Sequence, residues 1–145
     1  FYNSMAEEVE GAADAGGPAV ARAARFLAEA AQVAFRAKLV RHQHIAFEFA
    51  TAMTDVEIAV ALVRAAAPSG NDLLKAQARL WASQVALGAP SRMLAAVSAS
   101  GVLASEDICR LSQLADVDGA IALQAGRLGD MDFVAERITG CKLAA

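Results

Sequence analysis

Alanine takes a very large share of this sequence, and proline a very small one. There are 37 alanines and three prolines in 145 residues, and the β-branched and aromatic residues are thinly spread. Alanine has the highest helix propensity, whereas β-branched and aromatic side chains favour strands. The composition is therefore typical of closely packed helices and predicts an all-α fold. A chain of this length suffices for about one domain with a single core.

Glycine, proline and capping residues divide the chain into helical segments. We expect helices over about residues 4–38, 41–67, 71–100, 105–114 and 117–138. Pro18 follows two glycines inside the first segment, so a kink or a restart is expected there. Short connections between long helices favour antiparallel neighbours. The sequence therefore predicts a single domain over residues 1–145, an up-and-down four-helix bundle with an extra short helix.

Charge and hydropathy exclude two classes of partner. The formal net charge is −3, with 13 basic and 16 acidic side chains. Because the basic residues do not gather into a stripe, we expect no nucleic-acid partner. The mean hydropathy is +0.38, but charges interrupt every apolar stretch before it reaches the roughly 18–20 residues of a membrane span, so we expect no membrane partner. The two isolated cysteines and the lack of a secretory signal predict a reduced, cytoplasmic setting.

The start of the chain suggests that it belongs to something longer. The sequence opens on Phe1 without an initiator methionine, and its first five residues show no capping or periodic pattern. We therefore expect the C-terminal part of a longer protein.

Metal-dependent chemistry finds no support in the residues. His42 and His44 are two positions apart on an expected helix, so their side chains project about 200° from each other and do not share a metal ion. The two cysteines lack ligand spacing, and we expect no metal site. Glu7, Glu8 and Glu10 come before the Gly-Gly-Pro, where acids near a helix N-terminus simply favour the helix dipole.

The segment from Glu10 to Arg36 carries the most informative spacing. An acid is followed by Ala-Gly-Gly-Pro at residues 15–18 and, further on, by an arginine at position 36. This arrangement resembles the helix that opens the C-terminal domain of acyl-CoA dehydrogenases. Arg36 falls on the arginine of the family's R-x-x-F-G motif, although the F-G pair is absent here, and Gln43 falls on a glutamine that starts the family's next helix.

Later positions extend the resemblance over nearly the whole chain. Arg110 falls on the first arginine of the family's R-x-x-R-D segment, and Gly101 keeps the last glycine of its G-G-x-G-Y turn. The E-G-T segment that carries the catalytic base in most members falls on Ala-Leu-Gln at residues 122–124. An alanine at Ala122 is similar to the isovaleryl-CoA dehydrogenase branch, whose base comes instead from the opening helix, at the position of Glu10.

The resemblance implies an FAD-dependent oxidoreductase that dehydrogenates an acyl thioester, carried by coenzyme A or an acyl carrier protein. In that reaction a carboxylate, desolvated to raise its pKa, removes the proton α to the carbonyl while hydride leaves the β carbon. The resemblance implies Glu10 as the catalytic base. It implies Arg36 as a contact to the FAD pyrophosphate across a subunit interface, and Gln43 as a neutral polar contact to the cofactor. Same-family subunits, arranged as a tetramer, are the implied partners.

Two other functions stay open at this point. The second arginine and the aspartate of R-x-x-R-D are Gln113 and Leu114 here, and the Gly-Thr pair of E-G-T is lost. These replacements favour a catalytically degenerate subunit that serves oligomerisation beside an active partner. A flavin-dependent monooxygenase on the same scaffold is the third possibility.

Overall fold

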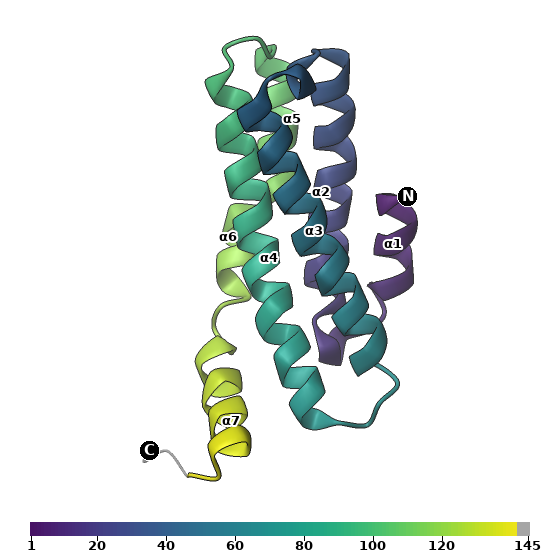
Figure 1. Ribbon diagram of the computed structural model, residues 1–145, viewed down its shortest axis with the longest axis vertical. Helices are drawn as coiled ribbons and strands as arrows, with labels where there is room; N and C mark the ends of the chain where they lie inside the picture. Colours follow the sequence, from purple (N-terminus) through teal and green to yellow (C-terminus); the bar gives the residue numbers. More distant parts are fainter. Residues whose placement is uncertain (142–145) are drawn as a thin grey trace.

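The computed structural model describes residues 1–141, and these are almost entirely helical (Figure 1). In chain order the elements are α1 (Tyr2–Val9), η1 (Ala13–Ala15), α2 (Gly17–Arg36), η2 (Leu39–Arg41), α3 (Gln43–Ala66), α4 (Asp72–Ala99), α5 (Ser105–Ala115), α6 (Val117–Ala122) and α7 (Arg127–Thr139). The described residues contain no strand. The predicted all-α class is confirmed.

The long helices α2, α3 and α4 lie side by side, and each runs antiparallel to the one before it (Figure 1). The α5–α6 segment returns along α2 and α4, α1 packs against the first half of α2, and α7 packs against α4. Asn71 starts α4 as predicted, because its side-chain Oδ1 accepts hydrogen bonds from the N–H groups of Leu73 and Leu74. α4 continues through Pro90, which lies inside the helix.

The first predicted helix, residues 4–38, is interrupted before Pro18. The chain leaves helical structure after Val9, and α1 folds back beside α2. Gly16 adopts a left-handed conformation with φ of 85°, which glycine tolerates without steric penalty. The restart at Gly17-Pro18 confirms the expected break, but Glu10 and Arg36 belong to different helices. The segment expected over residues 4–38 is therefore two helices, because the turn at residues 10–16 reverses the chain.

The core is built from small side chains that let the helices approach closely. Alanines supply much of the buried surface along α2, α3 and α4. A few larger side chains fill the space between them, and these include Phe26, Leu27, Met93 and Leu111, each no more than 1% exposed. Close packing of this kind makes the interior sensitive to any added volume.

A ladder of three ion pairs, which we call the α2–α5 ladder, fixes α2 against the chain that returns beside it. On α2 the three charged residues recur every seven positions, which places them on one face of the helix. The pairs are Arg22–Asp116, Glu29–Arg110 at 3.0 Å and Arg36–Asp107 at 3.6 Å. The signs alternate along α2, and the opposite signs follow in reverse chain order on the returning segment, so the three pairs favour the observed antiparallel register of α5.

Candidate functional site

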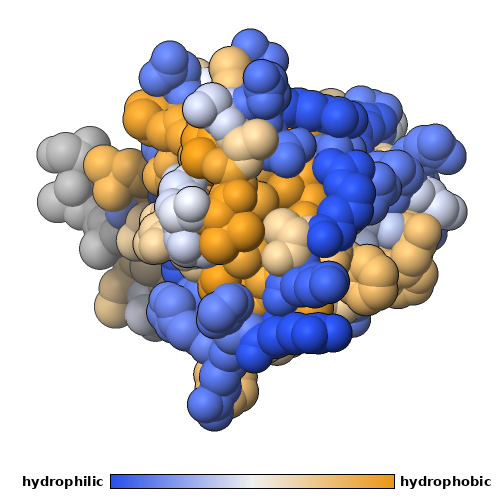
Figure 2. Space-filling view, turned by 90° about the horizontal axis from the view of Figure 1, so that it is seen from above, coloured by the Kyte–Doolittle hydropathy of each residue, from blue (hydrophilic) through white to orange (hydrophobic). Residues whose placement is uncertain are grey.

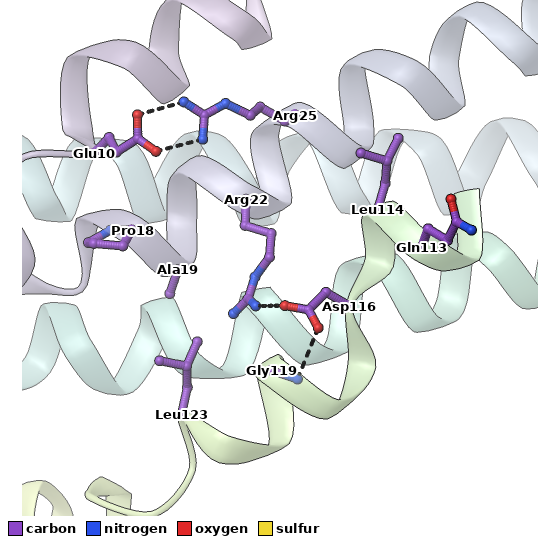
Figure 3. A pocket seen from close by; sticks show the side chains of 10 residues that line it. All are labelled: Glu10, Pro18, Ala19, Arg22, Arg25, Gln113, Leu114, Asp116, Gly119 and Leu123. Carbon is purple, nitrogen blue, oxygen red and sulfur yellow. Dashed lines mark hydrogen bonds and ion pairs between the residues drawn. The ribbon is translucent and has the colours of Figure 1, made fainter. Parts of the chain in front are cut away.

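A cleft of about 610 Å³ opens between α2 and the α5–α6 segment, where the end of α1 meets them (Figure 3). We call it the α2–α6 cleft. Its lining residues are Glu10, Pro18, Ala19, Arg22, Arg25, Gln113, Leu114, Asp116, Gly119 and Leu123. Four of these are charged residue types, two arginines, one glutamate and one aspartate, and the rest of the wall is mostly small or apolar. The cleft therefore combines apolar surface with a few convergent charges, as ligand sites commonly do.

The first turns of α2 supply one wall of the cleft. Pro18, Arg22 and Arg25 recur at intervals of four and three residues, which places them on one helix face. Pro18 lies in the first turn of α2, where its fixed φ and missing N–H cause no loss. The restart at Gly17 therefore determines which face of α2 turns toward the cleft. Two arginines start on that face, and Figure 3 shows Arg25 directed toward Glu10 and Arg22 toward Asp116.

Glu10 lies at the C-terminal end of α1 and points back toward α2. Its two carboxylate oxygens accept hydrogen bonds from Arg25 Nη1 at 2.8 Å and Nη2 at 2.6 Å. This hydrogen-bonded pair lowers the pKa of Glu10 below its ordinary value and raises that of Arg25. The Glu10 side chain is 52% exposed. In this arrangement Glu10 is an ionised, paired carboxylate, and the desolvation expected of a catalytic base is not provided by the described residues.

Arg22, Asp116 and Gly119 form a second charged unit across the cleft. Arg22 Nη1 donates to Asp116 Oδ2, and the Gly119 N–H donates to Asp116 Oδ1 at 3.2 Å. Asp116 has a positive φ of 42°, a conformation in which aspartate is found more often than most residues. A Cβ on Gly119 would lie 2.1 Å from Asp116 Oδ2 and 2.5 Å from Arg22 Nη1. Only glycine leaves room for this unit.

The other two predicted site residues lie at the opposite end of the molecule. Arg36 ends α2 and Gln43 begins α3, whereas Glu10 lies beside the start of α2. At about 1.5 Å per residue, the length of α2 separates its two ends by about 28 Å. One chain therefore cannot bring Glu10 and Arg36 to the same reacting group.

A shallow hollow of about 380 Å³ surrounds Arg36. It is lined by Phe35, Arg36, Lys38, Val40 and Arg41. Three basic residues gather here, and one of them, Arg36, also pairs with Asp107 at 3.6 Å. Figure 2 looks onto this end of the molecule and shows apolar surface bordered by hydrophilic groups. Guanidinium and ammonium donors beside apolar surface suit a dinucleotide pyrophosphate, so the residues present fit the FAD contact that the resemblance implies.

Residues 122–124, which the resemblance aligns with the family's usual base position, reach the cleft of Glu10 through Leu123. Ala122 is the last residue of α6, and Leu123, which follows it, lines the α2–α6 cleft. Gln113 and Leu114, which the resemblance aligns with the R-x-x-R-D segment, line the same cleft from α5. The structure thus brings Glu10 together with two segments that the sequence comparison singled out more than a hundred positions away.

Three charged residues of the cleft were missed in the sequence. Arg22 and Arg25 carry a usable signal, because their spacing of three places them on the face of Pro18. The sequence signal at Asp116 is weaker. An aspartate directly before the first residue of a helix, as Asp116 is for α6, is a typical N-cap. Nothing in the sequence around these three residues indicates that the two arginines contact carboxylates, one at the end of α1 and one between α5 and α6.

Among residues 1–141 there is no group of three or more His, Cys, Asp or Glu side chains arranged to hold a metal ion. Within the same residues no helix combines the length and the apolar character needed to cross a membrane.

Comparisons of the chain with protein-family models, curated proteins and solved structures found no match.

Proposed function

We propose that this chain is a helical domain of the acyl-CoA dehydrogenase type, an up-and-down bundle of α2, α3, α4 and the α5–α6 segment with α1 as an added short helix. In this proposal it forms part of an FAD-dependent oxidoreductase that removes two hydrogens from the α and β carbons of an acyl thioester. Glu10 takes the α proton, and FAD, when bound, supplies the hydride acceptor.

The α2–α6 cleft is the observation that carries the proposal. In the acyl-CoA dehydrogenase family, which this sequence resembles, the catalytic base comes from one of two places. It lies either in the opening helix or in the segment that aligns with residues 122–124. Glu10 represents the first position and Leu123 borders the second, and both line one cleft. Two alternative base positions are expected to face a common substrate pocket, because both must reach the same α proton.

The position of Arg36 and Gln43 supports a role in an oligomer. Both lie about the length of α2 away from Glu10, so in this proposal they contact the FAD of a neighbouring subunit. Lys38 and Arg41 border the same hollow as Arg36 and add positive charge near the pyrophosphate. Each subunit then contributes a base to one site and phosphate contacts to another.

One observation favours the degenerate subunit as a second candidate. Arg25 occupies both oxygens of Glu10 and lowers its pKa, whereas a general base works best with a pKa near the working pH. A chain whose Glu10 stays paired with Arg25 contributes subunit contacts and no proton transfer.

Flavin spectroscopy on the full-length protein, purified with any natural partner, tests the proposal. The protein should carry yellow flavin absorbance, and addition of an acyl-CoA without oxygen should bleach it. Glu10→Gln should keep the flavin and abolish the bleaching, because the amide cannot accept the α proton.

Glu8→Gln is the matched control. Glu8 also forms a two-point pair with an arginine, Arg64, and at 51% its side chain is as exposed as that of Glu10, but it lies outside the cleft. Bleaching should survive Glu8→Gln. Equal bleaching in wild type and Glu10→Gln would refute the base assignment, and flavin that appears only with a partner protein would favour the degenerate subunit.

A further inference from the structure

The outward face of α3 is exposed along most of its length. α3 packs against α4, α2 and α1 with its other sides (Figure 1). Six exposed residues follow the outward face at alternating intervals of four and three, and we call them the α3 seam. They are Phe47, Thr51, Thr54, Ile58, Ala61 and Ala65. Intervals of four and three in alternation are the pattern by which a helix faces another helix along its whole length. At about 1.5 Å per residue, the seam is about 27 Å long.

No residue of the α3 seam is charged, and its polar groups already have partners. Phe47 and Ile58 are large apolar side chains that are 62% and 43% exposed. The hydroxyl of Thr51 donates to the Phe47 carbonyl oxygen at 3.0 Å, and that of Thr54 donates to the Ala50 carbonyl oxygen at 2.9 Å. Because these donors are satisfied within α3 itself, covering the seam leaves no hydroxyl without a hydrogen bond.

The charged side chains that border the seam interact with the neighbouring helices of the same chain. The pairs are Glu57 with Tyr2 and Arg64 with Glu8 on the α1 side, and Asp55 and Glu48 with Arg92 on the α4 side. Burial of the seam therefore does not require an ionised side chain to lose its partner, which would be the main cost of covering a charged surface.

The sizes of the seam residues select the helix that fits against them. Phe47 lies at the N-terminal end of the seam, whereas Ala61 and Ala65 form its C-terminal end. A second α3 laid antiparallel along the seam brings Phe47 of one copy opposite Ala65 of the other, and Thr51 opposite Ala61. Large side chains then meet small ones, as close helix packing requires. A parallel copy would set Phe47 against Phe47 and leave the alanines facing alanines.

We propose that the α3 seam binds a second copy of this chain, with the two α3 helices antiparallel about a two-fold axis near Thr54 and Ile58. A self-complementary surface is what such a symmetric contact requires. The contact covers about 27 Å by 10 Å on each copy, which is less than the roughly 800 Å² per partner of a standard interface. The dimer should therefore be weak, with a dissociation constant in the micromolar range. This pairing requires neither flavin nor Glu10 and goes beyond the proposed function.

Sedimentation equilibrium of the full chain, from micromolar to near-millimolar concentration, tests the pairing and should show a monomer–dimer equilibrium. Ile58→Glu sets carboxylates of the two copies near the axis, and like charges there should weaken the dimer about ten-fold or more. Ile121→Glu is the matched control, because Ile121 is 55% exposed and lies on α6. It should leave the equilibrium unchanged. A chain that is monomeric at every concentration, or a dimer that Ile58→Glu weakens no more than Ile121→Glu does, would overturn the inference.

An exchange of sizes tests the antiparallel direction. Ala65→Phe alone should weaken the dimer, because two phenylalanines then meet at each end of the contact. Phe47→Ala combined with Ala65→Phe should restore it, since every large side chain again faces a small one. Both positions are exposed in the single chain, so circular dichroism should show the same fold in all variants. Failure of the double variant to recover the affinity lost in Ala65→Phe would refute the antiparallel pairing.

Disulfide cross-linking gives an independent measure of the register. Cys109 and Cys141 are exposed, so both are first replaced by serine. Chains with Thr51→Cys mixed with chains with Ala61→Cys should then form a cross-linked dimer on mild oxidation, whereas each variant alone should not. Cross-linking of Ala61→Cys with itself, and not with Thr51→Cys, would show a parallel pair and refute the proposal.

Discussion

Gly17 determines how α1 meets α2, and Gly17→Ala should disturb that junction. A Cβ on Gly17 would lie 1.9 Å from the Val9 carbonyl oxygen and 3.0 Å from that of Ala12. Contact distances of about 3.5 Å between non-bonded heavy atoms require the turn to open by about 1.5 Å. The obstacle is backbone, so no side-chain rotation relieves it.

The free energy of unfolding should fall by about 2 kcal/mol. Overpacking of a tight contact costs about 1–3 kcal/mol. The turn bonds Gly17 N to Ala12 O at 2.9 Å and Ala12 N to Val9 O at 3.0 Å also weaken, and each loses a fraction of the about 1 kcal/mol that such a bond contributes. Against this, replacing glycine by alanine reduces the entropy of the unfolded chain, a gain of about 0.4–1 kcal/mol.

Urea unfolding followed by far-UV circular dichroism measures the change, and the melting temperature should fall by about 4–8 °C. Gly88→Ala is the matched control, because Gly88 lies inside α4 and its Cβ would meet only the Arg92 side chain, at 3.6 Å. That variant should be more stable by about 0.5–1 kcal/mol. If Gly17→Ala were as stable as wild type while Gly88→Ala behaved as expected, the close approach of α1 and α2 at this point would be refuted.

Two further outcomes follow from the termini of helices. Asn71→Ala should lower the free energy of unfolding by about 1 kcal/mol, because the start of α4 loses its side-chain cap; urea unfolding measures it, and Asn71→Asp should retain most of the stability. Burial, aided by the hydrogen bond that Tyr2 donates to Glu57 at 3.0 Å, raises the Tyr2 pKa from 10.0 to about 12. Since the folded pKa is above the unfolded one, this stabilisation is complete below pH 10.0 and is lost as the pH rises toward about 12, a loss of roughly 2–3 kcal/mol. Tyr2→Phe should remove that pH dependence, and an unchanged slope would contradict the assignment to Tyr2.

Most of the helices were predictable because capping and turn residues close to each helix end mark where it begins or stops. Asn71 caps α4, the Pro68-Ser69-Gly70 cluster follows α3, and Gly-Gly-Pro restarts the chain at α2. Each of these signals acts over three or four residues. Local rules of this kind need no knowledge of what the helix packs against.

The reversal between α1 and α2 was not predictable in the same way. Residues 10–15 contain alanines and acids that fit a helix as well as a turn, and the tertiary contacts of α1 with α2 and α3 decide between them. The break between α5 and α6 at Asp116 was expected between the helices at residues 105–114 and 117–138. The positive φ of Asp116 was not, because an aspartate in that conformation is an exception to the usual preference.

The cleft itself followed only in part from the sequence. The resemblance pointed to Glu10 and to residues 122–124, and the structure places Glu10 and Leu123 in one cleft. The partner of Glu10 was not foreseen, because the Arg25 contact depends on the direction of α1. Pairing of side chains across a turn is a property of the packed helices, and spacing along the chain does not encode it.

The α2–α5 ladder has a consequence for the ways in which this chain can misassemble. Along α2 the charges read plus, minus, plus, and the residues opposite read minus, plus, minus. If α5 moved along α2 until Arg110 came opposite Arg22, or Asp116 opposite Glu29, like charges would meet and the favourable pairs would be lost. Small alanine side chains carry no charge that distinguishes one register from another, whereas the ladder does. A domain-swapped copy that docked its own α5 would need this same register to keep all three pairs.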